Sequence, residues 1–171
     1  MAIDSIADQS VRRLTVHSYK LSQLALSDEG DIMFKKVLLP ISTKTKERSM
    51  KAVEAALDLS PEEIVLLHVL EPIPEMIGGK DRQQLQREAD DIGKSIFGDY
   101  EDMIKKKNIH CSLILDRGVP ANVIVQVAER EDVDLIVMFS DGRDCVADML
   151  LGSCTERVLR NTSITLLIIR K

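Results

Sequence analysis

Two glycine positions separated by nine residues could together bind a phosphate group. Gly142 follows an apolar stretch at residues 134–139, and Gly152 stands with Ser153 directly before a helical pattern. Glycine lets the backbone approach a ligand closely, and the first turn of a helix presents unpaired N–H groups and the positive end of the helix dipole. The spacing therefore predicts a phosphate cradle at the end of a strand.

Ser153 also has a structural interpretation. Ser153 and Glu156 have the spacing of a capping box, in which the serine hydroxyl caps the helix and the glutamate reaches back to it. Such a cap would orient the N–H groups of the first turn outward, toward an anion. The structural and the functional role are therefore compatible.

The charges around the cradle oppose a bare phosphate. Residues 141–148 carry three aspartates against a single Arg143. A triphosphate would enter a net negative loop unless a divalent cation such as Mg²⁺ bridged it. Lys44 and Lys46, after the first apolar strand, either compensate this charge across the cleft or are solvated surface side chains.

The sequence offers no catalytic group. No Walker lysine, nucleophile–base pair or paired metal carboxylates can be placed, and no His, Cys or carboxylate spacing is typical of a metal site. Cys111 falls inside a strand pattern and is expected to be a buried, inert thiol, whereas Cys145 and Cys154 lie in or near the glycine segment and leave a redox role open. We therefore predict neither catalytic nor metal-binding residues.

Strands and helices alternate along most of the chain. Apolar runs predict strands at 37–41, 64–70, 109–115, 134–139 and 164–169, and helical spacing predicts helices at 47–59, 81–107, 120–130 and 153–161. The second helix is expected to be broken or kinked near Gly93 and Gly98. Alternation with short connections requires parallel strands joined by right-handed crossovers. The fold class is therefore α/β, a doubly wound sheet with its ligand site at the carboxyl ends of the first and fourth strands.

Composition excludes several classes of protein. The chain has 171 residues, of which 44% are hydrophobic and 30% charged, and its net charge is −5. This acidic balance argues against nucleic acid as a partner. No apolar run approaches the length of a membrane helix, and the N-terminus lacks the apolar region of a signal peptide. We expect a cytoplasmic protein with no membrane partner.

Residues 1–33 differ from the rest of the chain. Ile3, Ile6, Val11 and Leu14 are loosely helical in spacing, and a polar linker precedes Met33. In one interpretation Met33 is the true initiator. In the other, the extension is genuine and packs on the domain or on a partner subunit.

Several motifs, in order, resemble the universal stress protein family. They are KKVLLPI, IVLLHVLE, GVPANVIVQVAE, and DLIVM followed by LLGSCTERVLRNT. The resemblance runs from Met33 to Arg170, so residues 34–171 are identified as a universal stress protein domain after an N-terminal extension at residues 1–33. It implies a Rossmann-like open sheet of five parallel strands in the order 3-2-1-4-5, with helices on both faces.

The resemblance also implies a set of nucleotide-binding residues. Nucleotide-binding members of the family carry Gly-x-x-Gly, nine residues, and then Gly-Ser or Gly-Thr. The positions of this chain that correspond to the family's site, or that adjoin its glycines, are Pro40, Ser42, Val69, Met138, Gly142, Arg143, Gly152, Ser153 and Cys154. The ligand implied is ATP or AMP, with Mg²⁺ as a further component of the site.

Two positions depart from the family's pattern. Phe139 stands where the first glycine of the motif belongs, and its side chain hinders close approach of a ligand and disfavours positive φ. Ser42 stands where nucleotide-binding relatives have an aspartate that contacts adenine. Loss of that charge-assisted hydrogen bond would weaken binding by about 1–2 kcal/mol without abolishing it.

Two classes of function follow. The first is a regulatory module that binds an adenine nucleotide without efficient catalysis and is not an enzyme; the conserved spacing of Gly142 and Gly152 favours it. The second is a nucleotide-free, dimeric interaction protein, which Phe139, Ser42 and the acidic loop favour.

The last strand predicts a homodimer. The run from Ile164 to Ile169 is apolar on both faces and is expected at the edge of the sheet, where an exposed apolar strand invites pairing with another chain. The resemblance implies the same, since many family members pair their last strands antiparallel about a two-fold axis. The rival possibility is that residues 1–33 fold back and cover this edge, which would leave a monomer.

Overall fold

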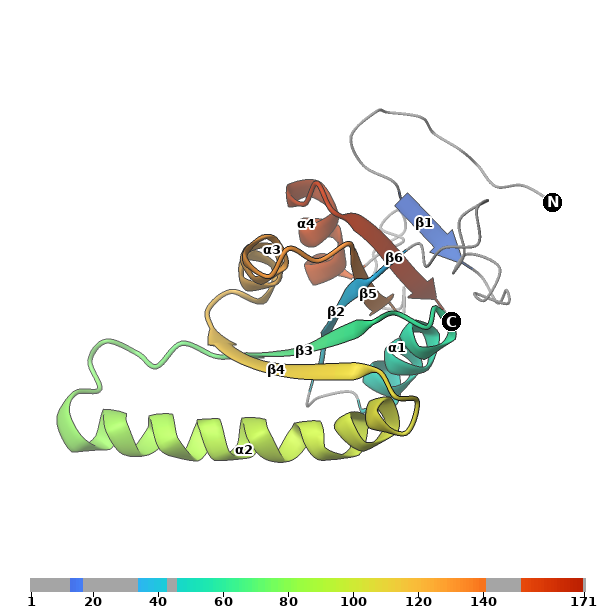
Figure 1. The fold of residues 1–171 in the computed structure, drawn as a ribbon. Helices are drawn as coiled ribbons and strands as arrows, with labels where there is room; N and C mark the ends of the chain where they lie inside the picture. Colours follow the sequence, from blue (N-terminus) through green and yellow to red (C-terminus); the bar gives the residue numbers. More distant parts are fainter. Residues whose placement is uncertain (1–12, 17–33, 43–45, 141–151, 171) are drawn as a thin grey trace.

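The computed structural model describes residues 13–16, 34–42, 46–140 and 152–170. The strands are β1 (Arg13–Val16), β2 (Lys36–Pro40), β3 (Glu63–Leu70), β4 (His110–Arg117), β5 (Leu135–Ser140) and β6 (Thr165–Arg170). The helices are α1 (Lys46–Asp58), α2 (Gly79–Lys105), α3 (Pro120–Arg130) and α4 (Ser153–Asn161). All the strand pairs are parallel, and the sheet has the order β1-β6-β5-β2-β3-β4 (Figure 1).

The predicted five-stranded sheet is confirmed. Read from β4, the order β4-β3-β2-β5-β6 corresponds to the expected 3-2-1-4-5. The chain adds β3 and β4 on one side of β2 and then β5 and β6 on its other side, so the topological switch point lies between β2 and β5. Each predicted strand and helix is present within a few residues of its expected bounds. The periodicity of apolar residues was sufficient to locate these strands and helices, because each strand–helix–strand unit is continuous in the sequence.

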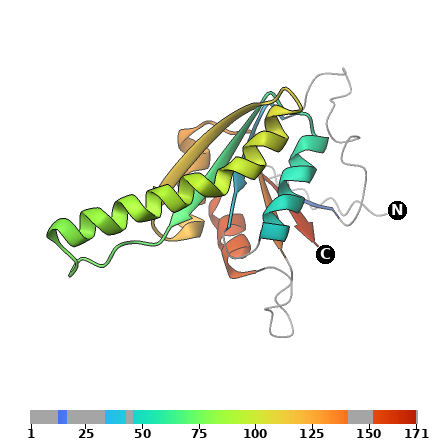
Figure 2. The same ribbon diagram turned by 90° about the horizontal axis from the view of Figure 1, so that it is seen from below.

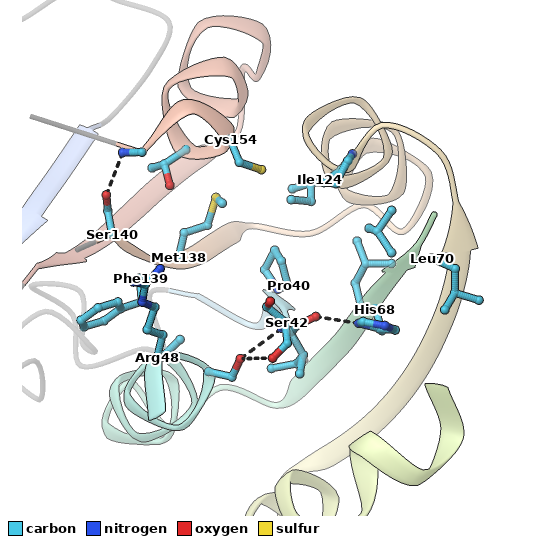
Figure 3. Close-up of a pocket in the computed structure, with 18 of the residues that line it drawn as sticks. Pro40, Ser42, Arg48, His68, Leu70, Ile124, Met138, Phe139, Ser140 and Cys154 are labelled. Atoms are coloured by element: carbon cyan, nitrogen blue, oxygen red, sulfur yellow. Dashed lines mark hydrogen bonds between the residues drawn. The ribbon is translucent and has the colours of Figure 1, made fainter. Parts of the chain in front are cut away.

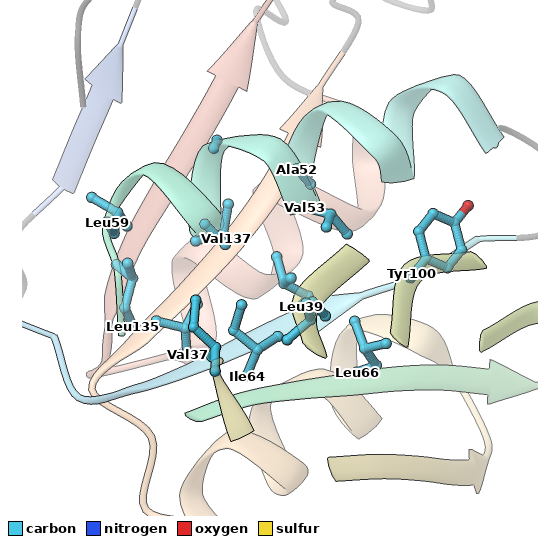
Figure 4. Close-up of a cluster of buried hydrophobic side chains, with 14 of the residues drawn as sticks. Val37, Leu39, Ala52, Val53, Leu59, Ile64, Leu66, Tyr100, Leu135 and Val137 are labelled. Carbon is cyan, nitrogen blue, oxygen red and sulfur yellow. The ribbon is translucent and has the colours of Figure 1, made fainter. Parts of the chain in front are cut away.

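Helices cover both faces of the sheet. Val37, Leu66 and Val137 point to the face covered by α1 and α2, where they join a core that includes Tyr100 of α2 (Figure 4). The next residues along each strand, such as Met138, point to the face covered by α3 and α4. We call these two clusters the α1–α2 core and the α3–α4 core. A side chain's position in a strand thus decides which core it joins.

The predicted edge position of the last strand is wrong. β1, from the N-terminal extension, pairs with β6 over four residues, with Leu14 opposite Leu167 and Val16 opposite Ile169. This segment is a strand and not part of the helix that its apolar spacing suggested. Four residues are too few for periodicity to distinguish the two. The homodimer itself stays a prediction, and dimerisation through β6 is predicted only for a chain in which β1 does not occupy that edge.

The second helix, expected to be broken or kinked near Gly93 and Gly98, is not broken. α2 runs without interruption for 27 residues and projects past the sheet at its N-terminal end (Figures 1 and 2). Gly93 has a packing role, since a Cβ atom there would lie 2.6 Å from the Cδ2 atom of Leu115 in β4. Absence of a side chain allows α2 to approach the strand closely.

Within the described ranges, no helix combines the length and the apolar composition needed to cross a membrane.

Candidate functional site

A cleft opens where β2 and β5 separate. Their pairing ends at Leu38 opposite Ile136, and two residues later Pro40 faces β5 without an N–H group that could continue the ladder. α1 packs on one face of the sheet and α4 on the other, so neither helix fills the space beyond the ends of β2 and β5. The cleft has a volume of about 630 Å³ and lies at the carboxyl edge of the sheet, as predicted (Figure 3).

The cleft brings together seven of the nine predicted site residues. Its lining includes Pro40, Ser42, Val69, Met138, Gly152, Ser153 and Cys154. Gly142 and Arg143 lie outside the described residues. Elements separated by about one hundred residues in sequence therefore meet at one place, which the parallel topology requires.

The start of α4 differs from the predicted capping box. Gly152 is the N-cap residue, Ser153 is the first residue of the helix, and no side chain of the described residues caps the first turn. The N–H of Gly152 donates instead to the hydroxyl oxygen of Ser140 across 3.0 Å (Figure 3). This non-local contact attaches α4 to the end of β5, and it leaves the N–H groups of the first helical turn directed at the cleft.

Replacing Ser140 with alanine is expected to destabilise the protein by about 1–2 kcal/mol. Ser140 is buried, and its removal deprives the Gly152 N–H of its acceptor. The matched control is Ser153→Ala, which should change the free energy of unfolding by less than about 0.5 kcal/mol because Ser153 is exposed and caps nothing. Urea denaturation measures both. A larger destabilisation by Ser153→Ala than by Ser140→Ala would instead support the capping box that the sequence predicted.

Phe139 does not point into the α3–α4 side of the cleft. Its ring packs against the α1–α2 core, with the Lys51 ammonium 5.5 Å from the ring centroid. Met138, one residue earlier, projects to the opposite face and lines the cleft there. Phe139 still borders the cleft, beside Arg48 of α1 (Figure 3).

The segment after β2 is held by two buried side chains. The hydroxyl of Ser49 accepts the N–H of Ser42 at 3.1 Å and lies 3.4 Å from the Ser42 carbonyl oxygen, to which it donates. The Nδ1 atom of His68 lies 2.8 Å from the carbonyl oxygen of Ile41. A carbonyl oxygen can only accept, so Nδ1 carries the proton. These contacts fix the backbone at the position of the family's adenine-binding aspartate.

The peptide groups of Val69 face the cleft. In a parallel ladder, a residue directs its N–H and C=O to one neighbouring strand, and the next residue directs both to the other. The Leu67 carbonyl accepts from Ile41, and the Leu70 carbonyl accepts from Gly118 beyond β4. Val69 has the parity of Leu67, so its polar groups point past the end of β2, where no described residue pairs with them.

The positive charge at the cleft comes from an unexpected residue. Lys46, for which compensation of the acidic loop and a solvated surface position were both left open, forms an ion pair with Asp99 of α2. Arg48 lines the cleft from the first turn of α1 instead. Lys44 lies outside the described residues.

The thiols of Cys111 and Cys154 are not activated, and Cys145 lies outside the described residues. Burial raises the pKa of the Cys154 thiol above its ordinary value, and the charge of Arg157 offsets only part of that rise. Burial, with a smaller contribution from Glu101, raises the pKa of Cys111 to about 11. Both thiols stay protonated near neutral pH and are therefore weak nucleophiles. Within the described ranges, no group of three His, Cys, Asp or Glu side chains could hold a metal ion.

The model of the universal stress protein family matches residues 33–170. The chain is 31% identical over 160 residues to universal stress protein MJ0577 of Methanocaldococcus jannaschii, covering 82% of this chain and 97% of that protein. The universal stress protein of Methanothermobacter thermautotrophicus is 30% identical over 145 residues, covering 81% and 97%. The chain belongs to the universal stress protein family.

Solved structures of universal stress proteins share the fold. The structure of MJ0577 superposes with a TM-score of 0.69 at 26% identity, covering 82% of this chain and 98% of that one. UspA of Lactobacillus plantarum superposes with a TM-score of 0.66 at 17% identity, covering 82% and 100%. A universal stress protein in complex with cAMP and an Arabidopsis thaliana family member with AMP bound each superpose with a TM-score of 0.60, at 21% and 19% identity.

Sequence reasoning missed several residues of the site. Ser140, Arg48 and Ser49 line the cleft, and the contacts of Ser140 with Gly152 and of Ser49 with Ser42 each join two different elements or segments. His68 was expected to be a hydrogen-bonded side chain in the interior or at a strand end. The structure agrees, since the His68 side chain is buried and hydrogen-bonded. The alternation of side chains along β5 could have indicated Ser140, since it has the same parity as Met138.

Proposed function

We propose that this universal stress protein binds an adenine nucleotide, ATP or AMP, in the cleft between β2 and β5 and acts as a regulatory module. The observation that carries the proposal is the convergence of two kinds of main-chain group on one cavity. The peptide groups of Val69 face one end of the cleft, and the first turn of α4 faces the other. The volume of about 630 Å³ is in the range of small-molecule sites.

The Val69 end suits an adenine base. Adenine presents a ring-nitrogen acceptor, N1, beside an amino donor, so one N–H and one C=O of the same residue can pair with both. Apolar side chains flank this position on the α3–α4 face, namely those of Pro40, Ile124 and Met138. A flat purine can bury its faces against them while its edge is hydrogen-bonded.

The α4 end suits the phosphate. The helix begins at Gly152, whose lack of a side chain leaves the first N–H groups accessible, and the helix dipole favours an anion there. Arg48 adds a positive charge on the other side of the cleft. If the ligand is ATP, a divalent cation such as Mg²⁺ would have to be held mainly by the nucleotide's own phosphates, since the described residues offer no ligand cluster.

Related proteins support the ligand class. The family members named above with cAMP and with AMP have the same fold. Their identities of 21% and 19% carry the architecture to this chain and not the details of the contacts. The proposal therefore depends on the cleft described here.

Calorimetry with AMP and ATP, each with and without Mg²⁺, tests the proposal. GMP is the matched control, since its O6 acceptor replaces the amino donor of adenine and would face the Val69 carbonyl. Heat with AMP or ATP and little with GMP is expected. Absence of heat at millimolar concentration of every adenine nucleotide would refute the function.

We further propose that the module does not catalyse efficiently. Cys154 is the thiol that lines the cleft at the start of α4, and its raised pKa keeps it protonated and weakly nucleophilic. Incubation with ATP should release phosphate no faster than a few turnovers per hour. Faster turnover that follows the protein through purification would overturn this part of the proposal.

A nucleotide-free interaction protein is the second candidate function. Phe139 favours it, because a bulky side chain replaces the glycine that would let a phosphate approach the end of β5. Ser42 favours it too, because a hydroxyl replaces the aspartate carboxylate with which nucleotide-binding relatives contact adenine.

Replacing Phe139 with glycine distinguishes the two candidates. If the cleft is otherwise competent, the dissociation constant of AMP should fall by roughly one order of magnitude, equivalent to about 1.4 kcal/mol. The variant should lose stability, since the ring leaves the α1–α2 core and glycine weakens a strand. Phe139→Ala is the control for packing loss, because it removes the ring but keeps a Cβ atom. Unchanged affinity in a folded glycine variant would favour the interaction protein.

A further inference from the structure

His68 interrupts the pairing between β2 and β3 at the cleft. The last bond of this ladder runs from the Ile41 N–H to the Leu67 carbonyl, with a length of 2.7 Å. The next bond in a parallel ladder would run from the Val69 N–H to the Ile41 carbonyl. That bond is absent among the described residues, and the Ile41 carbonyl accepts from the His68 ring at 2.8 Å instead (Figure 3).

The neighbouring groups hold this arrangement in place. Ser49 binds both the N–H and the carbonyl of Ser42, which keeps the segment after β2 beside the end of β3. His68 belongs to the face of β3 that packs on the α1–α2 core, and only 8% of it is exposed. Its ring is therefore confined, and the contact with Ile41 is made inside the protein and not at its surface.

We propose that His68 is a positioning residue that keeps the Val69 N–H free for the ligand. By withdrawing the Ile41 carbonyl from the ladder, the imidazole leaves one unpaired main-chain donor at the base end of the cleft. This inference rests on the proposed function, since the acceptor for that donor is the N1 atom of adenine. His68 itself need not touch the nucleotide.

Two substitutions separate this role from simple packing. His68→Leu fills the apolar surroundings but offers no donor, so the ladder should extend by one bond and the Val69 N–H should pair with Ile41. His68→Asn places an amide N–H near the position of Nδ1 and should preserve the native arrangement.

Amide hydrogen exchange of the full chain without nucleotide tests the geometry directly. The Val69 amide should exchange quickly in the native protein and in His68→Asn, and at least tenfold more slowly in His68→Leu. Equal exchange rates in the native and leucine proteins would overturn the inference. This measurement does not depend on whether any nucleotide binds, so its failure and the failure of the proposed function are distinguishable.

An AMP analogue with C–H in place of N1 tests the link to the ligand. The native protein should bind AMP about fivefold to tenfold more tightly than this analogue, which is the worth of one hydrogen bond. In His68→Leu that preference should vanish, and in His68→Asn it should remain. A leucine variant that is folded and keeps the preference would show that His68 has only a packing role.

Discussion

Replacing Gly152 with valine is expected to abolish nucleotide binding while the protein stays folded. Gly152 has φ −62° and ψ 149°, a conformation that valine adopts readily, and among the described residues an added Cβ atom would meet only the Ser140 hydroxyl, at 3.8 Å. The branched side chain would instead occupy the space in front of the first turn of α4, where we place the phosphate. Calorimetry with millimolar AMP should detect no heat.

A second glycine provides the control for this experiment. Gly98 lies on α2 away from the cleft, and nothing approaches within 4 Å of the Cβ atom that a substitution would add there. Gly98→Val should leave the affinity for AMP unchanged. Thermal unfolding of both variants verifies that each is folded. Normal binding by a folded Gly152→Val protein would mean that the phosphate does not lie at the start of α4.

Removing residues 1–32 is expected to convert a monomer into a dimer. β1 covers the edge of β6, and without it Leu166, Leu167 and Ile168 would belong to an exposed apolar edge strand. Such an edge pairs readily with a second copy of itself. Light scattering at micromolar concentration should give the mass of one chain for the full-length protein and of two for the truncated one.

A full-length variant separates loss of β1 from loss of the other N-terminal residues. The double substitution Leu14→Pro with Thr15→Pro must remove one hydrogen bond to β6, because consecutive residues of a strand direct their N–H groups to opposite sides. It should dimerise as the truncated protein does. A dimeric full-length protein, or monomeric variants that stay folded, would show that β1 does not control this edge.

The sequence determined the architecture of the domain and the place of its cleft. Apolar runs and helical spacing are local properties, and their alternation predicts a parallel sheet, because a helix between two strands returns the chain to the end of the sheet where the first strand began. Pro40 marked the end of the first strand, and Gly152 marked the start of a helix at the same edge. Seven predicted site residues therefore line the cleft, although no local signal connects them.

Tertiary structure alone decided which polar groups of the cleft remain available. Ser140 takes the N–H of Gly152, His68 takes the carbonyl of Ile41, and Asp99 takes the charge of Lys46. In each pair the packing of the fold brings the two groups together, and their spacing in the sequence does not indicate the contact. The same is true of β1, whose four residues have no clear strand pattern and form a strand because β6 offers an unpaired edge. Hydrogen-bond partners across a fold depend on packing to a fraction of an ångström, which one-dimensional periodicity does not specify.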